Sequence, residues 1–407
     1  MNDNSERNDF PPIHPDFWLL DPAVTFLNHG SFGACPGAVL ERQQQLRMEM
    51  EREPVEFLVR KMPPLLDASR GALAELINAD PADVVFVQNA TAGVNSVLRS
   101  LSFQPGDELL VTDHDYNACR NVVRYVAERT GAVVVEARVP TPVESSRQVV
   151  DAVLARVTPR TRVAMLDHVT SPTAIVFPIE EIARELDRRG VDTLVDGAHA
   201  PGMIPLDINR IGAAYYTGNC HKWLCAPKGA AFLHVRPDRQ NGIQPPIVSH
   251  GWNRSRPGYS PFQDAFDWQG TLDPTPWLCV GEAIRFMGAL LDGGIAALMR
   301  RNRGLAIRAR QILCRRLDVA PVCAESLLGS MAAVRLPDEM AMPYAAPATV
   351  GCNAADRLHD DLLARFGIET PVYFWPEEPQ TILRVSAQAY NHAAQYEKLA
   401  DVLKEMG

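Results

Sequence analysis

The sequence predicts an α/β protein with a doubly wound, mostly parallel sheet and a smaller α+β region toward its C-terminal end. Its 407 residues are enough for one large domain and a smaller one, each with its own core. Between residues 84 and 197, short β-rich runs alternate with helical stretches. The runs are apolar at nearly every position, which is typical of strands that helices cover on both faces.

The expected elements follow one another in a regular order. Four strand–helix pairs and a fifth strand lie at 84–88 with 91–101, 108–112 with 117–130, 132–136 with 147–157, 162–166 with 179–190, and 193–197. Residues 240–276 are rich in Pro, Gly, Ser and aromatics and predict a long irregular connection of functional importance. Helices are then expected at 277–318, 354–367 and 391–405, and strands at 331–336 and 382–387. We therefore expect an N-terminal segment (1–24) that packs with the small domain, a large domain (25–276) and a small C-terminal domain (277–407).

Composition argues against several classes of partner. The formal net charge is -9 and no basic tract is visible, so neither nucleic acid nor an anionic membrane is expected to bind. The longest apolar runs have the length of a strand and are too short to span a bilayer. The N-terminus is polar and acidic where a signal peptide would be basic and then apolar, which favours a cytoplasmic location. Eight cysteines without a CxxC pair indicate reduced thiols and no metal site.

The most informative feature is the pair of segments LVDGAHAPG (194–202) and GNCHKWLCAPKG (218–229). They place a carboxylate, Asp196, at the end of an apolar strand and a lysine, Lys222, in a compact turn. A pyridoxal 5′-phosphate (PLP) enzyme needs a lysine to hold the cofactor aldehyde as a Schiff base and an acid to keep the pyridine nitrogen protonated. We assign Lys222 to the first role and Asp196 to the second. A turn-capping role for Asp196 is compatible with this assignment.

Four more segments fit a cofactor site, each beside an ordinary structural interpretation. Thr91 in QNATAGVN opens a helix whose free N–H groups could cradle a phosphate, or it is a simple N-cap. His199 either contacts the cofactor's phenolic oxygen or is a structural histidine. Tyr116, preferred to His114, could stack on the pyridine ring. Arg384, inside an apolar strand, either grips a substrate α-carboxylate bidentately or pairs with an acidic side chain.

These motifs give the chain a resemblance to the class V aminotransferase superfamily of PLP enzymes, and within it to the isopenicillin N epimerase group. The segments LLDPAVTFLNHGSFGACP, TDHDYNA, DHVTSPTAIVFP, VDGAHAPG, GNCHKWLCAPKG, QGTLDPTPWL and LRVSAQAYN carry the resemblance, from about residue 20 to 405. It implies the fold of type I PLP transferases and a homodimer with the cofactor near the subunit interface.

The resemblance also implies roles for individual residues. Lys222, Asp196 and His199 would be catalytic. Further cofactor contacts would come from Ala90, Thr91, Tyr116, Ser171, Asn219 and His221, and from Gly270 and Thr271 toward the neighbouring subunit's cofactor. The substrate side would be lined by Asn28, His29 and Gly30, and Arg384 would take the carboxylate.

The reaction itself remains open among three outcomes of Cα proton removal by Lys222. Racemisation or epimerisation is favoured, C–S β-elimination is second, and transamination is third. An epimerase needs a proton donor for the opposite face, and His29, Tyr116, His250 and Tyr373 are the candidates. Persulfide chemistry is disfavoured because residues 367–385 contain no cysteine, and a non-catalytic binding protein is disfavoured because Lys222, Asp196 and Arg384 are all present. Loops 249–262 and 368–378 are expected to line the side-chain pocket.

Overall fold

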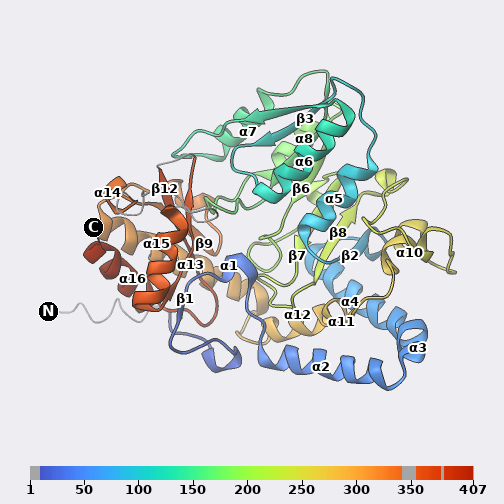
Figure 1. Cartoon of the computed structure of the whole chain (residues 1–407), viewed down its shortest axis with the longest axis horizontal. Helices are drawn as coiled ribbons and strands as arrows, with labels where there is room; N and C mark the ends of the chain where they lie inside the picture. Colours follow the sequence, from blue (N-terminus) through green and yellow to red (C-terminus); the bar gives the residue numbers. More distant parts are fainter. Residues whose placement is uncertain (1–9, 342–353, 377–379, 407) are drawn as a thin grey trace.

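A seven-stranded sheet forms the centre of the computed structural model, which describes residues 10–341, 354–376 and 380–406 (Figure 1). The strand order is β2-β8-β7-β6-β5-β3-β4, with β8 antiparallel to both neighbours and every other pair of adjacent strands parallel. The strands are β2 (Val84–Val87), β3 (Glu108–Thr112), β4 (Val133–Ala137), β5 (Thr161–Asp167), β6 (Asp192–Asp196), β7 (Tyr215–Asn219) and β8 (Ala231–Val235). The predicted doubly wound, mostly parallel sheet is confirmed.

Both faces of this sheet are buried because successive strand residues join different cores. Val85 and Val87 pack with the helices α5 (Ala90–Ser100) and α6 (Asn117–Thr130). Val84 and Phe86 belong to a second core, which includes side chains of α7 (Ser146–Leu154) and α8 (Ile179–Asp187). Alternation along a strand sends neighbouring side chains to opposite faces, so apolar residues at every position bury the sheet on both sides.

The N-terminal part of the described chain connects the central sheet with the C-terminal elements. It contains β1 (Thr25–Phe26), α1 (His29–Phe32), α2 (Gly37–Arg52), α3 (Pro54–Glu56) and α4 (Met62–Ile77). β1 pairs in parallel with β10 (Ile368–Glu369). Trp18 packs edge-on against Tyr390, with 5.2 Å between the ring centroids. Residues 10–24 therefore contact the C-terminal part of the chain, while residues 1–9 lie outside the described residues.

The C-terminal elements form an α+β layer of their own, on one side of the molecule (Figure 1). An antiparallel sheet has the order β11-β12-β9, from β9 (Met331–Arg335), β11 (Val372–Phe374) and β12 (Thr381–Ser386). The helices are α13 (Gly294–Leu317), α14 (Asp338–Ala341), α15 (Ala354–Phe366) and α16 (Ala393–Met406). The domain boundary expected at residue 276 stays a prediction.

Two stretches differ from expectation. The connection 240–276 contains the helix α10 (Pro261–Asp267), whose start is fixed by a capping box between Ser260 and Gln263. The helical stretch 277–318 is divided into α11 (Thr275–Leu278), α12 (Val280–Gly288) and α13, and the last break falls at Gly293, whose φ is 90°. The short helix α9 (Ile208–Ile211) precedes β7. No helix within the described ranges is long and apolar enough to cross a bilayer.

Candidate active site

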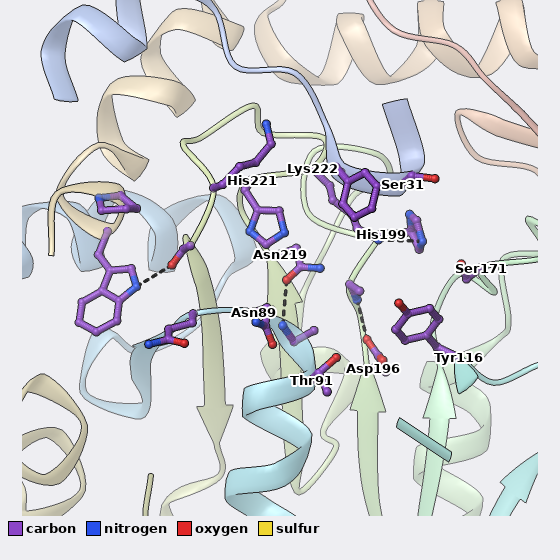
Figure 2. A pocket seen from close by; sticks show the side chains of 18 of the residues that line it. Ser31, Asn89, Thr91, Tyr116, Ser171, Asp196, His199, Asn219, His221 and Lys222 are labelled. Carbon is purple, nitrogen blue, oxygen red and sulfur yellow. Dashed lines mark hydrogen bonds between the residues drawn. The ribbon is translucent and has the colours of Figure 1, made fainter. Parts of the chain in front are cut away.

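The carboxyl ends of β2, β5, β6 and β7 open onto a cavity of about 850 Å³, which is within the size range of small-molecule sites. The position is the one expected for ligands in an open α/β sheet. Nine of the residues predicted from the sequence line it: Ala90, Thr91, Tyr116, Ser171, Asp196, His199, Asn219, His221 and Lys222. Figure 2 shows Asp196 at the base of the space, with Lys222 and His199 above it.

Lys222 lies in the turn that follows β7, and its amine reaches into the cavity. Its Nζ is 3.1 Å from Nε2 of His199. Burial, followed by the positive charge of Arg384, lowers the pKa of Lys222 to about 7. A large fraction of this amine is therefore neutral near physiological pH, which is the form that attacks an aldehyde.

Asp196 ends β6 and is only 2% exposed. Its Oδ1 accepts the N–H of Ala198 at 3.0 Å, and its Oδ2 accepts the thiol of Cys119 at 2.9 Å. Among the described residues no Lys, Arg or His forms an ion pair with this carboxylate, and burial raises its pKa. A buried acid of this kind is stabilised by a cation that enters the site, and a protonated pyridine nitrogen meets that need. The residues present therefore fit the predicted cofactor.

His199 lies between Lys222 and Trp223. Its Nδ1 accepts from the indole N–H of Trp223 at 3.5 Å, and burial followed by the charge of Lys222 lowers its pKa well below the usual value. The ring is therefore neutral. Its place on the cavity wall, next to the Lys222 amine, is compatible with the predicted contact to the cofactor, which stays a prediction.

The start of α5 provides a cradle for an anion. Asn89 caps this helix by accepting the N–H of Ala92 at 2.8 Å, and Asn219 Oδ1 accepts the N–H of Ala90 at 2.8 Å. A Cβ on Gly93 would lie 2.2 Å from Oγ1 of Thr217, so the absence of a side chain lets the helix start approach β7 closely. Because the N–H groups of Ala90 and Ala92 already donate to these asparagines, a phosphate at this end would be held by Thr91, which lines the cavity, with the support of the helix dipole.

Arg384 is completely buried in β12, behind the cavity wall. It donates to the backbone oxygen of Ser171 at 2.7 Å and to Ser31 Oγ at 3.0 Å, and more weakly to Ser171 Oγ and Asn28 Oδ1. All of these partners are neutral, no described acidic side chain forms an ion pair with it, and its Nε has no partner. The alternative of a structural ion pair therefore lacks an acid in the described part of the chain, which leaves a buried cation suited to a carboxylate.

Several predicted residues lie apart from the cavity lining. His29 is fully buried, with Nδ1 2.7 Å from the Tyr390 hydroxyl and Nε2 3.0 Å from the backbone oxygen of Lys222. Asn28 and Gly30 lie beside Arg384 rather than on the wall. Gly270 and Thr271 do not line this chain's cavity, and Thr271 is exposed.

The loops expected to form the side-chain pocket also lie elsewhere, since no described residue of 249–262 or 368–378 lines the cavity. Of the four candidates for a second proton donor, Tyr116 alone lines it. Tyr373 stacks with Arg384 at 5.4 Å, and His250 lies at a separate groove.

Several residues of the site were not singled out from the sequence, among them Ser31, Asp167 and Cys119. Ser31 lines the cavity and contacts Arg384, and Asp167 lines it at the end of β5, directly beside Asp196 in the sheet register. Cys119 holds the carboxylate of Asp196 from the first turn of α6. A polar residue at a strand end could have indicated Asp167. For Ser31 and Cys119 no local pattern in the sequence gives a signal.

Comparison with known proteins agrees with this geometry. The family model "Aminotransferase class-V" matches residues 36–325. An isopenicillin N epimerase of Streptomyces clavuligerus is 37% identical over 397 residues, 95% of each chain. A probable chloroplastic L-cysteine desulfhydrase of Arabidopsis thaliana is 30% identical over 96% of this chain and 84% of its own length. The structure of a cystine C-S lyase in complex with cysteine persulfide superposes with a TM-score of 0.77 at 22% identity, over 94% of this chain and 98% of the other, which is a likeness of fold.

Proposed function

This chain belongs to the class-V aminotransferases, and on that premise we propose that it racemises or epimerises the Cα of an amino acid or of an amino-acid-containing substrate. Its cofactor is pyridoxal 5′-phosphate, as predicted. The observation that carries the proposal is that two groups able to exchange a proton, Lys222 and Tyr116, bound the same cavity from different elements. Inversion at carbon requires proton removal on one face and proton return on the other.

Lys222 is the group that removes the Cα proton. Its amine has a pKa of about 7 because of burial and the charge of Arg384, so it can both accept and return a proton near neutral pH. Asp196 would pair with the pyridine nitrogen, and the start of α5 with Thr91 would hold the phosphate. The bound cofactor supplies an electron-accepting ring that acidifies the Cα–H bond of an attached amino acid.

Tyr116 is our candidate for the group that returns the proton. Its side chain is 44% exposed and lies on the cavity wall at the start of α6. Partial burial of the side chain raises the pKa of its hydroxyl, and the nearby Cys119 and Asp196 add to this effect. The hydroxyl therefore keeps its proton at neutral pH. Arg384 would fix the substrate carboxylate, and with it the orientation of Cα between these two groups.

A C–S β-lyase is the second candidate, favoured by the 30% identity to a protein named as a probable L-cysteine desulfhydrase. The same base would then remove the Cα proton, and a sulfur leaving group would depart from Cβ. No cysteine lines the cavity in the described part of the chain, which disfavours a reaction in which the enzyme's own thiol accepts sulfur.

Proton NMR in heavy water distinguishes the two reactions. The PLP-loaded enzyme is incubated with a panel of L-amino acids, aminoacyl peptides and cysteine conjugates, while the Cα signal and new products are followed. Loss of the Cα–H signal with the opposite configuration accumulating supports epimerisation. Release of a keto acid together with a thiol or other sulfur product would contradict epimerisation and show β-elimination instead. The Lys222→Ala variant, which lacks the base, serves as the background.

A further inference from the structure

We propose that Cys119 is a positioning residue that holds the carboxylate of Asp196 in place for the pyridine nitrogen of the cofactor. This inference rests on the proposed role of Asp196. Cys119 lies in the first turn of α6, is completely buried, and its Sγ is 2.9 Å from Oδ2 of Asp196. The contact joins a helix on one face of the sheet to the end of a central strand.

The direction of this hydrogen bond follows from chemistry. An ionised carboxylate only accepts hydrogen bonds, so the thiol is the donor. Burial, followed by the negative charge of Asp196, raises the pKa of Cys119 well above its ordinary value, so the sulfur keeps its proton. A thiol in these surroundings is inert as a nucleophile and available as a donor.

The two oxygens of Asp196 are thereby held from two different segments, the turn after β6 and the first turn of α6. Ala198 donates its N–H to Oδ1 and Cys119 its S–H to Oδ2, which fixes the rotation of the carboxylate. Each oxygen retains a free lone pair for a cation. These two hydrogen bonds also affect where the negative charge lies. Asp167 is beside Asp196 in the sheet, and burial together with the charge of Asp196 raises the pKa of Asp167. Donors to Asp196 keep the negative charge on it rather than on its neighbour.

A purely structural role for Cys119 is the competing explanation, since its side chain also packs in the core with Val123 and Val122. The two explanations differ in what a deletion changes. Loss of packing lowers stability alone, whereas loss of the thiol donor changes how Asp196 meets the cofactor. Val123 is a matched control, because it lies one turn further along α6, is 1% exposed and belongs to the same core.

The experiment compares Cys119→Ala, Cys119→Ser and Val123→Ala with the parent enzyme. The readouts are the PLP dissociation constant of the apoenzyme, from titration followed by absorbance, and the pH at which the visible spectrum of the holoenzyme changes. Cys119→Ala is expected to weaken PLP binding by about tenfold, the scale of one hydrogen bond to a charged group, and to displace the spectral transition. Cys119→Ser restores a donor and should stay within about threefold of the parent. Val123→Ala should lower the melting temperature and leave both readouts unchanged.

The proposal is overturned if Cys119→Ala matches Val123→Ala in both readouts, or if Cys119→Ser is as impaired as Cys119→Ala. Asp196→Asn separates this failure from failure of the Asp196 assignment. An unchanged spectrum in Asp196→Asn would reject the proposed pairing of Asp196 with the pyridine nitrogen. A large spectral change in Asp196→Asn together with an unchanged spectrum in Cys119→Ala would reject only the role of Cys119. In the double variant, Cys119→Ala should add no further loss of PLP affinity to that of Asp196→Asn.

Discussion

Lys222 illustrates how a single side chain acquires its chemistry from its neighbours. An exposed lysine has a pKa near 10.4 and is almost fully protonated at pH 7. Here burial is the largest cause of the lower pKa and the charge of Arg384 is the second, while Asp196 opposes both. The same arginine that would hold a substrate carboxylate therefore helps to keep the lysine reactive. Binding of an anionic substrate would neutralise part of this effect.

We predict that the rate of Schiff-base formation between apoenzyme and PLP rises with pH and levels off above about 7. Only the neutral amine attacks the aldehyde. At pH values below the pKa of about 7, each decrease of one pH unit should therefore lower the rate about tenfold. The measurement is stopped-flow absorbance, with borohydride trapping and mass spectrometry to locate the bond. Lys222→Ala should show no trapped adduct. A rate that continues to rise to pH 10 would mean that the amine keeps an ordinary pKa.

Arg384→Ala is predicted to raise KM for amino-acid substrates by about a hundredfold, since the loss of one partner of a buried charge pair costs about 2–5 kcal/mol. The PLP dissociation constant should change much less than KM, because Arg384 lies behind Ser31 and Ser171 and acts on the cofactor site only through its charge near Lys222. Steady-state kinetics and PLP titration test the two parts separately. Arg384→Lys keeps the charge but loses the bidentate fork, and should be intermediate. Equal KM in parent and alanine variant would place the carboxylate elsewhere.

Among the elements, the short helix α1 with its flanking residues links the two halves of the site. His29 contacts the backbone of Lys222, while Asn28 and Ser31 contact Arg384. Gly33 allows this seating, because its φ is 71° and a Cβ there would lie 2.2 Å from the backbone oxygen of His221. The N-terminal segment is thus a structural part of the site, although it precedes the central sheet in sequence.

Gly33→Ala is therefore predicted to displace α1 from the lysine turn and to weaken PLP binding by about tenfold or more, with a lower melting temperature. The control is Gly71→Ala inside α4, where a Cβ would meet nothing within 4 Å. That change should leave PLP binding intact and raise stability by up to about 1 kcal/mol, because alanine favours a helix. Differential scanning fluorimetry and PLP titration provide both values. Unchanged binding in Gly33→Ala would show that α1 is not needed in this position.

The elements of the central sheet could be predicted from sequence because each carries a local signal. The helix at 117–130 is found as Asn117–Thr130, and the strand at 108–112 as Glu108–Thr112. α10 was not expected because its capping box lies in a Pro- and Gly-rich stretch whose composition is typical of a loop. Cys119 and Ser31 could not be recognised because their partners, Asp196 and Arg384, lie 77 and 353 residues away. Contacts of this kind depend on the assembled fold.

At the scale of the whole molecule, exposed apolar side chains mark a surface that a second copy of the chain could cover. Val59 is 50% exposed and Trp252 65%, so both of these large apolar side chains face solvent in the single chain. A groove of about 170 Å³ is lined both by Val59 and by residues adjacent to Trp252, so the two segments meet on one surface. Thr271 is exposed and absent from this chain's own cavity. The homodimer stays a prediction, and this surface is a candidate for its interface.

We predict that Thr271 completes the cofactor site of a partner subunit, and subunit complementation tests this. Thr271→Glu would place a carboxylate against the phosphate, and like charges in contact cost several kcal/mol, so activity should fall at least about tenfold. Lys222→Ala should be inactive for want of the base. In a mixed dimer, one site would combine the intact Lys222 of the first variant with the intact Thr271 of the second, while the other site would carry both defects.

The mixture of the two variants, unfolded together and refolded, should therefore regain activity up to about a quarter of the parent, since half of the dimers are mixed and each has one intact site. Each variant refolded alone is the control, and analytical ultracentrifugation should give twice the 44.9 kDa chain mass. If Thr271 acted within its own chain, every site in the mixture would contain one defect and no activity would return. The restored fraction thus reports where Thr271 acts, whichever reaction the enzyme catalyses, because both variants fail at the cofactor.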